Sequence, residues 1–387
     1  MASPRVRVGM VVFAMVMAGG MFLFALSVCG VGRPDGKPIG IDFVAYWAAA
    51  RLALQGQWQA LYDNSVIEAF ERAHVTLSGP GYLAFYYPPP FLLLCLPLAL
   101  LPYVAALFAF IGAQAALLWT ALRRILPGTD FVLPIVAFPG FVMNAFSGQN
   151  GGLTASCFAG AMIFLDSRPL LGGACLGALV YKPQMALAVP VALLAARRFR
   201  ATAAAAGTAG GLCVLSYVAM GAGPWRGFLT NAGAARGDLE HLAQKWRMMD
   251  SFYADVRLSG GSLTAGYGGQ ILVAAVALTI LAVICWRRPG AAPEGAALAA
   301  TALLVTPFLY DYDFVVLAGA LAWLTGSAAR GGLLTGEAVL LPVLYLLPLT
   351  SIAVRFGFGV PLAPLFVLIT LLLVLRRVTL SAATIGA

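Results

Sequence analysis

Apolar segments separated by short polar turns follow one another along almost the whole chain. A helix needs about 20 apolar residues to cross a bilayer, and each segment has this length or is somewhat shorter. The pattern therefore predicts an all-α polytopic membrane protein with about 12 transmembrane helices. The segments lie at residues 8–30, 103–122, 131–147, 150–165, 170–181, 183–196, 201–221, 268–286, 296–310, 312–326, 338–354 and 361–375.

A further apolar run, residues 88–101, is interrupted at Pro97 and ends before Pro102. Short runs of this kind are more often interfacial or re-entrant than spanning. If it does not cross, the arginine clusters fall on the side of both termini, which the positive-inside rule makes cytoplasmic. That side then carries a net charge of +9, which is the charge of the whole chain. The clusters are Arg5/Arg7, Arg123/Arg124, Arg197/Arg198/Arg200, Arg287/Arg288 and Arg376/Arg377.

The composition supports this interpretation, because 61% of residues are hydrophobic and 10% are charged, whereas a soluble domain has about 25% charged residues. The basic residues lie at the ends of apolar runs, so they indicate orientation and no nucleic-acid surface. The six cysteines lack the paired spacing of disulfides or zinc sites. The first apolar run is too long for a signal peptide and predicts a retained helix.

We expect one transmembrane domain over residues 1–387 with two large outer loops. The first, residues 31–102, contains amphipathic helices, and the second covers residues 222–267. The unusual polar residues concentrate on this outer side, whereas the inner turns contain little besides Arg, Pro and Gly. The predicted location is a bacterial inner (cytoplasmic) membrane, with the active site facing the periplasm or outside.

Asp42 is the most distinctive residue of the first outer loop. It stands at the head of a predicted amphipathic helix, where the positive end of the helix dipole favours the ionised carboxylate. A carboxylate in this place suits a catalytic base. The alternative is that Asp42 only caps the helix and that the aromatic residues of the loop lie in the headgroup layer.

Lys182 lies between two apolar segments that are too short to cross a membrane alone. Irregular backbone at membrane depth persists only where protein or water satisfies it, so the turn predicts a cavity that opens outward. An intramembrane lysine is by default a functional candidate. The alternative is that Lys182 snorkels to the outer interface.

Cations beside a lipid-facing cavity suit a phosphate group on a lipid, and a nearby carboxylate could deprotonate an attacking hydroxyl. Aromatic and amide side chains suit a sugar. The sequence therefore predicts glycosyl transfer from a lipid-phosphate sugar. Its donor-phosphate candidates are Lys182, Lys245, Arg247 and Arg355. Its substrate-binding candidates are Tyr46, Tyr86, Tyr87, Gln149, Asn150, His241, Tyr310, Asp311 and Asp313.

Neither a Walker loop nor a Rossmann glycine fingerprint is found, so no nucleotide site is predicted. Asp311 and Asp313 have Asp-x-Asp spacing in a tight turn. A divalent cation there is the one cofactor that the sequence leaves open, and no definite metal site is assigned.

The order of several short motifs resembles glycosyltransferase family 87. They are Gly-Ile-Asp-Phe at 40–43, Phe-Tyr-Tyr-Pro-Pro-Pro at 85–90, Ser-Gly-Gln-Asn at 147–150, Tyr-Lys-Pro at 181–183, Arg-Arg-Phe-Arg at 197–200 and Thr-Pro-Phe-Leu-Tyr-Asp-Tyr-Asp at 306–313.

The resemblance implies a GT-C fold and a polyprenyl-phosphate sugar donor, with mannose in the best-known members. It implies that Asp42 is the base that activates the acceptor hydroxyl and that Lys182 binds the donor phosphate. Mycobacterial members are associated with histidines in a later outer loop, and here that loop offers His241 in a different context. The acceptor is expected to be a lipid or a glycan, and the reaction to invert the anomeric centre.

Two other functions fit the same residues. One is a flippase or transporter of lipid-linked sugars, although the two halves show no convincing internal repeat. The other is a polymerase or ligase acting on lipid-diphosphate glycans, which also needs cations on the outer side.

Overall fold

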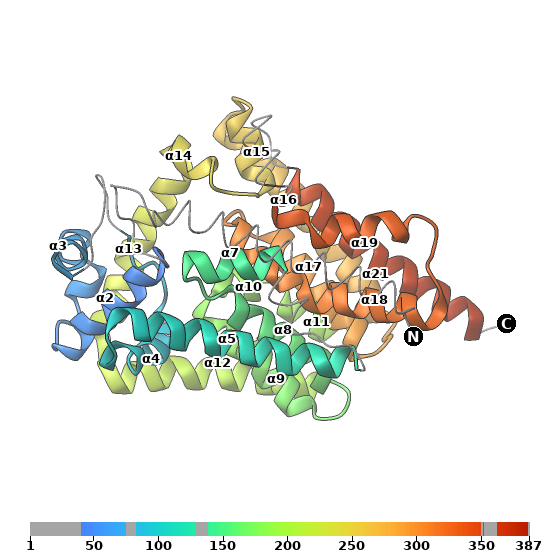
Figure 1. Cartoon of the computed structure of the whole chain (residues 1–387), viewed down its shortest axis with the longest axis horizontal. Helices are drawn as coiled ribbons and strands as arrows, with labels where there is room; N and C mark the ends of the chain where they lie inside the picture. The colour runs from blue at the N-terminus through green and yellow to red at the C-terminus, as the bar shows by residue number, and fades with distance from the viewer. Residues whose placement is uncertain (1–39, 75–82, 128–137, 350, 352–361, 386–387) are drawn as a thin grey trace.

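The structure is a computed structural model, and it describes residues 40–74, 83–127, 138–349, 351 and 362–385 (Figure 1). The described part is helical, and its one isolated β-bridge joins Met249 to Tyr310. The predicted first helix, residues 8–30, lies outside the described residues, as does Arg355.

Within the described residues, five helical stretches are long and apolar enough to cross a membrane: α5 (Tyr103–Ile125), α12 (Phe199–Met220), α16 (Leu263–Trp286), η4 with α18 (Asp311–Gly331) and α21 (Ala363–Ile385). Each coincides with a predicted apolar segment. Long uninterrupted apolar runs form continuous helices because every backbone polar group is then satisfied within the helix. The protein is therefore an integral membrane protein.

Shorter helices fill the space between these five. The short membrane-region helices are α7 (Pro139–Ser147), α8 (Gly151–Phe164), α9 (Pro169–Gly177), η3 (Ala178–Tyr181), α10 (Pro183–Ala186), α11 (Val189–Ala195), α17 (Ala291–Val305) and α19 (Glu337–Tyr345). Prolines begin or interrupt several of them, since proline lacks the N–H that a helix interior requires. The apolar segments are thus helical as predicted, but many are too short to be counted as spans.

The segment predicted as the first outer loop, which keeps that name below, forms α2 (Phe43–Leu54), η1 (Ala60–Tyr62), α3 (Asn64–His74), α4 (Pro89–Cys95) and η2 (Leu98–Leu100). The prediction of an amphipathic helix after Asp42 is wrong for α2, because ten of its twelve residues are buried. Small alanines and apolar side chains occupy almost every position of α2, and the helix contacts η1, α3, α4, η2 and α5. The amphipathic helix of the loop is α3, which buries Ile67 and Glu71 and exposes charged residues.

The segment predicted as the second outer loop, which also keeps its name below, forms α13 (Ala222–His241), α14 (Ala243–Trp246) and α15 (Phe252–Leu258). Its end is attached to the 306–313 segment by the bridge at Met249 and by a hydrogen bond from Asp250 N to Leu309 O at 2.7 Å. In Figure 1, α2, α3 and α13 lie together at the left, and the C-terminal end of α21 lies at the right.

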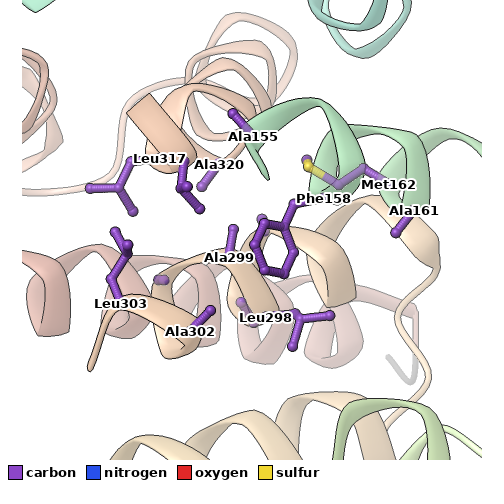
Figure 2. Close-up of a cluster of buried hydrophobic side chains, with 14 of the residues drawn as sticks. Ala155, Phe158, Ala161, Met162, Leu298, Ala299, Ala302, Leu303, Leu317 and Ala320 are labelled. Carbon is purple, nitrogen blue, oxygen red and sulfur yellow. The ribbon is translucent and has the colours of Figure 1, made fainter. Parts of the chain in front are cut away.

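A large hydrophobic core surrounds α8 and α17 (Figure 2). Phe158 and Met162 of α8 contact this core, and both are almost fully buried. The two helices approach closely at Gly295, where an added Cβ would lie 2.4 Å from Met162 Cγ. A second hydrophobic cluster holds the first outer loop against α5 and includes Phe43, Tyr46 and Phe91.

Ion pairs join helix ends near two of the arginine clusters, Arg197/Arg198/Arg200 and Arg376/Arg377. Arg198 contacts Asp166 at 2.6 Å and Glu294 at 2.5 Å, which ties the start of α12 to the α8–α9 turn and to the start of α17. Arg377 donates to Glu337 at 2.8 Å, which ties α21 to α19. We call these residues the arginine end.

Candidate active site

A cavity of about 610 Å³ lies between the outer loops and the nearby helix turns. It brings together side chains from five separate parts of the chain. Of the predicted site residues, it is lined by Asp42, Tyr46, Tyr86, Tyr87, Gln149, Lys182, Lys245, Tyr310 and Asp313. We call it the main cavity.

The turn before α2 is attached to the α7–α8 turn by main-chain hydrogen bonds. Gly40 N donates to Phe146 O at 3.0 Å, and Asp42 N donates to Ser147 O at 2.9 Å. Gly40 and Gly148 both have positive φ, and a Cβ on Gly148 would lie 2.9 Å from Gly40 Cα. Only glycine tolerates this backbone conformation and this close approach. The two turns therefore place Asp42 beside Gln149.

Gln149 connects Asp42 to two tyrosines. Its Nε2 donates to Asp42 Oδ2 at 2.8 Å, and its Oε1 accepts from Tyr46 OH at 2.5 Å and from Tyr87 OH at 3.2 Å. The two tyrosine hydroxyls are themselves 3.0 Å apart. Because the tyrosines donate to Oε1, the amide must point its NH₂ group at the carboxylate. The network thus fixes both the position and the orientation of the Asp42 side chain.

Lys182 does not snorkel to the surface. It is buried, and its Nζ donates to Asp313 Oδ1 at 2.6 Å and to Asn150 Oδ1 at 3.2 Å. Asn150 Nδ2 reaches back to Tyr46 OH at 3.5 Å. A continuous hydrogen-bonded network therefore runs from Asp42 through the amides to the Lys182–Asp313 ion pair.

Burial raises the pKa of the Asp42 carboxyl above its ordinary value. The hydrogen bond from Gln149 and the positive charge of Lys245 act in the opposite direction but are weaker. The expectation that the helix dipole favours the ionised form is therefore outweighed. The capping alternative fails too, because the Asp42 side chain makes no hydrogen bond to the N-terminal N–H groups of α2. A carboxyl with a raised pKa is a stronger base than an ordinary aspartate.

Lys245 on α14 lines the main cavity and is half-buried. Among the described residues it has no carboxylate within ion-pair distance. Lys182 differs, because Asp313 offsets its charge at 2.6 Å. Lys182 therefore presents a balanced ion pair to the main cavity, whereas Lys245 presents a positive charge with no carboxylate in contact among the described residues.

Several predicted site residues do not line the main cavity. His241 is exposed, and its Nε2 lies 3.9 Å from Glu240 Oε2. Arg247 is exposed at the end of α14. Asn150 lies behind the lining and acts through Tyr46 and Lys182.

The Asp-x-Asp segment does not form a paired carboxylate site. Asp313 is committed to Lys182, while Asp311 Oδ1 accepts from the neighbouring Tyr312 N at 2.8 Å. Within the described ranges, no group of three His, Cys, Asp or Glu residues is arranged to hold a metal ion. The geometry gives the divalent-cation alternative no support.

The sequence interpretation missed the contribution of α13 to the cavity. Asn231, Ala235 and Asp238 line it, and Asp238 Oδ2 accepts from Tyr86 OH at 2.9 Å. These three residues are spaced four and three apart, which places them on one face of a helix. That spacing was the available signal for the contribution of α13.

The comparisons with known proteins agree with the membrane architecture. The family model of glycosyltransferase family 87 matches residues 85–307, which is more than half of the chain. Gln149, Lys182 and Lys245 lie within the matched residues, whereas Asp42 and Asp313 lie outside them. No curated protein and no solved structure matches the chain.

Proposed function

The chain belongs to glycosyltransferase family 87 and is a membrane glycosyltransferase, and from this premise we propose that it transfers a hexose, mannose first among the candidates, from a polyprenyl-monophosphate donor. The acceptor is a hydroxyl of a lipid or glycan. The observation that carries the proposal is the oriented, partly buried Asp42 carboxylate in a cavity that also contains Lys245 and Lys182.

Asp42 is the general base of the proposed reaction. Its Oδ1, which accepts no hydrogen bond from the described residues, takes the proton of the acceptor hydroxyl, while Gln149 donates to Oδ2. The acceptor oxygen forms a bond to the anomeric carbon as the bond to the phosphate oxygen breaks. Attack from the face opposite the phosphate inverts the configuration, so a β-linked donor yields an α-linked product.

Lys245 is the residue that best suits the donor phosphate. Its charge is not offset by a carboxylate among the described residues, and a charge-assisted hydrogen bond to the phosphate stabilises the negative charge of the leaving group. The paired Lys182 lies on the other side of the network and keeps Asn150 and Tyr46 in place. Tyr86 and Tyr87 offer faces and hydroxyls to the sugar.

The arrangement of charges supports an outer-facing site. None of the residues of the arginine end lines the main cavity, and the positive-inside rule makes a side that is rich in arginine cytoplasmic. A polyprenyl donor would reach the cavity from the outer leaflet. The GT-C fold implied by the motifs has the same sidedness.

Purified protein in lipid nanodiscs tests the proposal directly. Polyprenyl-monophosphate [¹⁴C]mannose is the donor, and heat-treated membranes of a strain lacking the gene supply the accumulated acceptor. We expect label in a product whose new linkage is α by NMR. Movement of intact labelled donor across the bilayer without bond cleavage would instead indicate a flippase. Absence of cleavage with mannose and with other hexose donors would overturn the proposal.

A further inference from the structure

A second cavity, of about 520 Å³, lies next to the main cavity along an adjacent face of α13, and the two share Asn231. We call it the side cavity. It is formed where η1 and the following turn contact α13, and its lining is Gln59, Tyr62, Asp63, Gly223, Arg226, Gly227, Thr230, Asn231 and Ala234. Its volume falls within the range of about 300–1,000 Å³ typical of small-molecule sites.

Two glycines of α13 allow this helix to pack closely against η1 beside the side cavity. A Cβ on Gly227 would lie 2.8 Å from the Tyr62 ring, and one on Gly223 would lie 3.1 Å from Gln59 Cγ. The glycines are four residues apart and therefore lie on one helix face. They allow α13 to approach η1, so the polar residues of both elements line one hollow.

Asn231 joins the two cavities. It lines both of them, it is 8% exposed, and its Nδ2 has no hydrogen-bond partner among the described residues. Leaving a buried amide donor unsatisfied costs about 1–3 kcal/mol. An amide kept in this state at the junction of two cavities is suited to a ligand that supplies an acceptor oxygen there.

The side cavity differs in chemistry from the main cavity. Asp63 and Arg226 bring one negative and one positive side chain, and they do not pair with each other. Hydrogen bonds from Ser65 hold the pKa of the Asp63 carboxyl below its ordinary value, so it is ionised at neutral pH. The remaining polar groups are amides and hydroxyls. A balanced set of this kind suits a neutral polyhydroxylated ligand, because hydroxyls both donate and accept.

Resting on the proposed function, we propose that the side cavity binds the sugar residues of a glycan-bearing acceptor that precede the hydroxyl being modified. The acceptor glycan then passes Asn231 from the side cavity into the main cavity, where its terminal hydroxyl meets Asp42. The acceptor class is thus an oligosaccharide chain, carried on a lipid or free.

A matched pair of synthetic acceptors tests this proposal: octyl α-mannoside and the octyl glycoside of a linear mannotriose. We expect the kcat/KM of the wild-type protein to be about tenfold higher for the trisaccharide. In Ala234→Trp, whose indole fills the side cavity, that ratio should fall close to one. Leu229→Trp is the matched control on the same helix, since Leu229 is 67% exposed and lines neither cavity.

Binding of free mannotriose, measured by saturation-transfer NMR, separates this proposal from the function itself. Binding to the wild type that is lost in Ala234→Trp and kept in Leu229→Trp supports the side cavity even if no transfer occurs. Lack of binding by the wild type, or an equal ratio of the two acceptors in wild type and Ala234→Trp, overturns it. Transfer to free mannotriose indicates a soluble glycan, and transfer only to the octyl form indicates a lipid-linked one; both support the glycan site.

Discussion

The arginine end and the main cavity both contain buried charges, but they use them differently. At the arginine end each buried carboxylate contacts an arginine, as in Glu294 with Arg198 and Glu337 with Arg377. In the main cavity, Asp42 contacts an amide, and the nearest cations act on it only through space. Charges of the first kind connect helices. A carboxylate that contacts an amide and no cation, such as Asp42, takes up a proton more readily, and groups perturbed in this way are typical of functional sites.

Asp42→Asn gives the largest effect expected from this comparison. A general base contributes about 10²–10⁴-fold to rate, so transfer measured with the labelled donor should fall by that factor. The stability of the folded protein, by contrast, should stay the same or rise slightly. The folded state raises the Asp42 pKa, so the contribution of this group to stability is present below its unfolded pKa and is lost as pH rises through the folded pKa.

At pH 8 the asparagine variant therefore should unfold at the same temperature as the wild type or slightly higher, as measured by thermal unfolding in nanodiscs. Glu68→Gln is the control, because Glu68 belongs to the same loop but forms a partly exposed pair with Arg72. A parallel loss of activity and stability in Asp42→Asn would show that Asp42 is structural.

Glu337→Gln should lower stability and leave kcat unchanged, which is the reverse of the effect expected for Asp42→Asn. It leaves Arg377 buried without its charged partner, and removing one member of a buried pair costs about 3–5 kcal/mol. We expect a clear drop in the unfolding temperature, whereas the kcat of the folded fraction stays unchanged. Loss of kcat without loss of stability would mean that the arginine end takes part in the reaction.

Lys245→Met tests which lysine contacts the donor. Loss of a charge-assisted hydrogen bond of about 1.4 kcal/mol corresponds to a tenfold change, so the KM for the polyprenyl-phosphate donor should rise about tenfold. Arg247→Met is the neighbouring control outside the cavity lining. An equal rise in both variants would indicate a general electrostatic effect on the donor.

Gln149→Leu has the smallest expected effect and concerns pH. The hydrogen bond from Gln149 lowers the Asp42 pKa, so its removal should raise that pKa further. The acid limb of log kcat/KM against pH should then move to higher pH. Thr154→Val, which removes a hydroxyl bonded to Tyr181, should leave the limb in place. If the acid limb does not move in Gln149→Leu, Asp42 is not the group whose ionisation controls the rate.

The spans that the sequence predicted well are those with one long apolar run. The run at 103–122 corresponds to α5, and the run at 201–221 corresponds to α12. The short runs were predicted as helical, but their lengths gave no indication of how they pack. Helix α2 shows the difficulty, because it is preceded by Asp42 and carries Arg51 in its last turn, yet it is buried on almost every side.

Several of the residues chosen from the sequence line the main cavity, but the sequence did not indicate which of them contact one another. Asp42 and Gln149 are 107 residues apart, and Lys182 and Asp313 are 131 residues apart. Both aspartates and Lys182 were chosen from their chemistry alone. That Lys182 belongs to Asp313 follows from the packing of α8, η3 and η4, which a single sequence does not specify. His241 was chosen for its residue type, although it is exposed and does not line the main cavity.

The interlocked glycines at 40 and 148 have a consequence for how this enzyme can change. Asp42, the proposed base, and Gln149, which hydrogen-bonds to it, both lie in turns held by main-chain hydrogen bonds, and these bonds do not depend on which side chains surround them. Substitutions of other residues that line the main cavity can therefore adapt it to another sugar, while the Asp42 oxygen proposed to accept the proton keeps its position. Because main-chain hydrogen bonds hold these two turns together, related proteins can acquire a different substrate preference while the reaction stays the same.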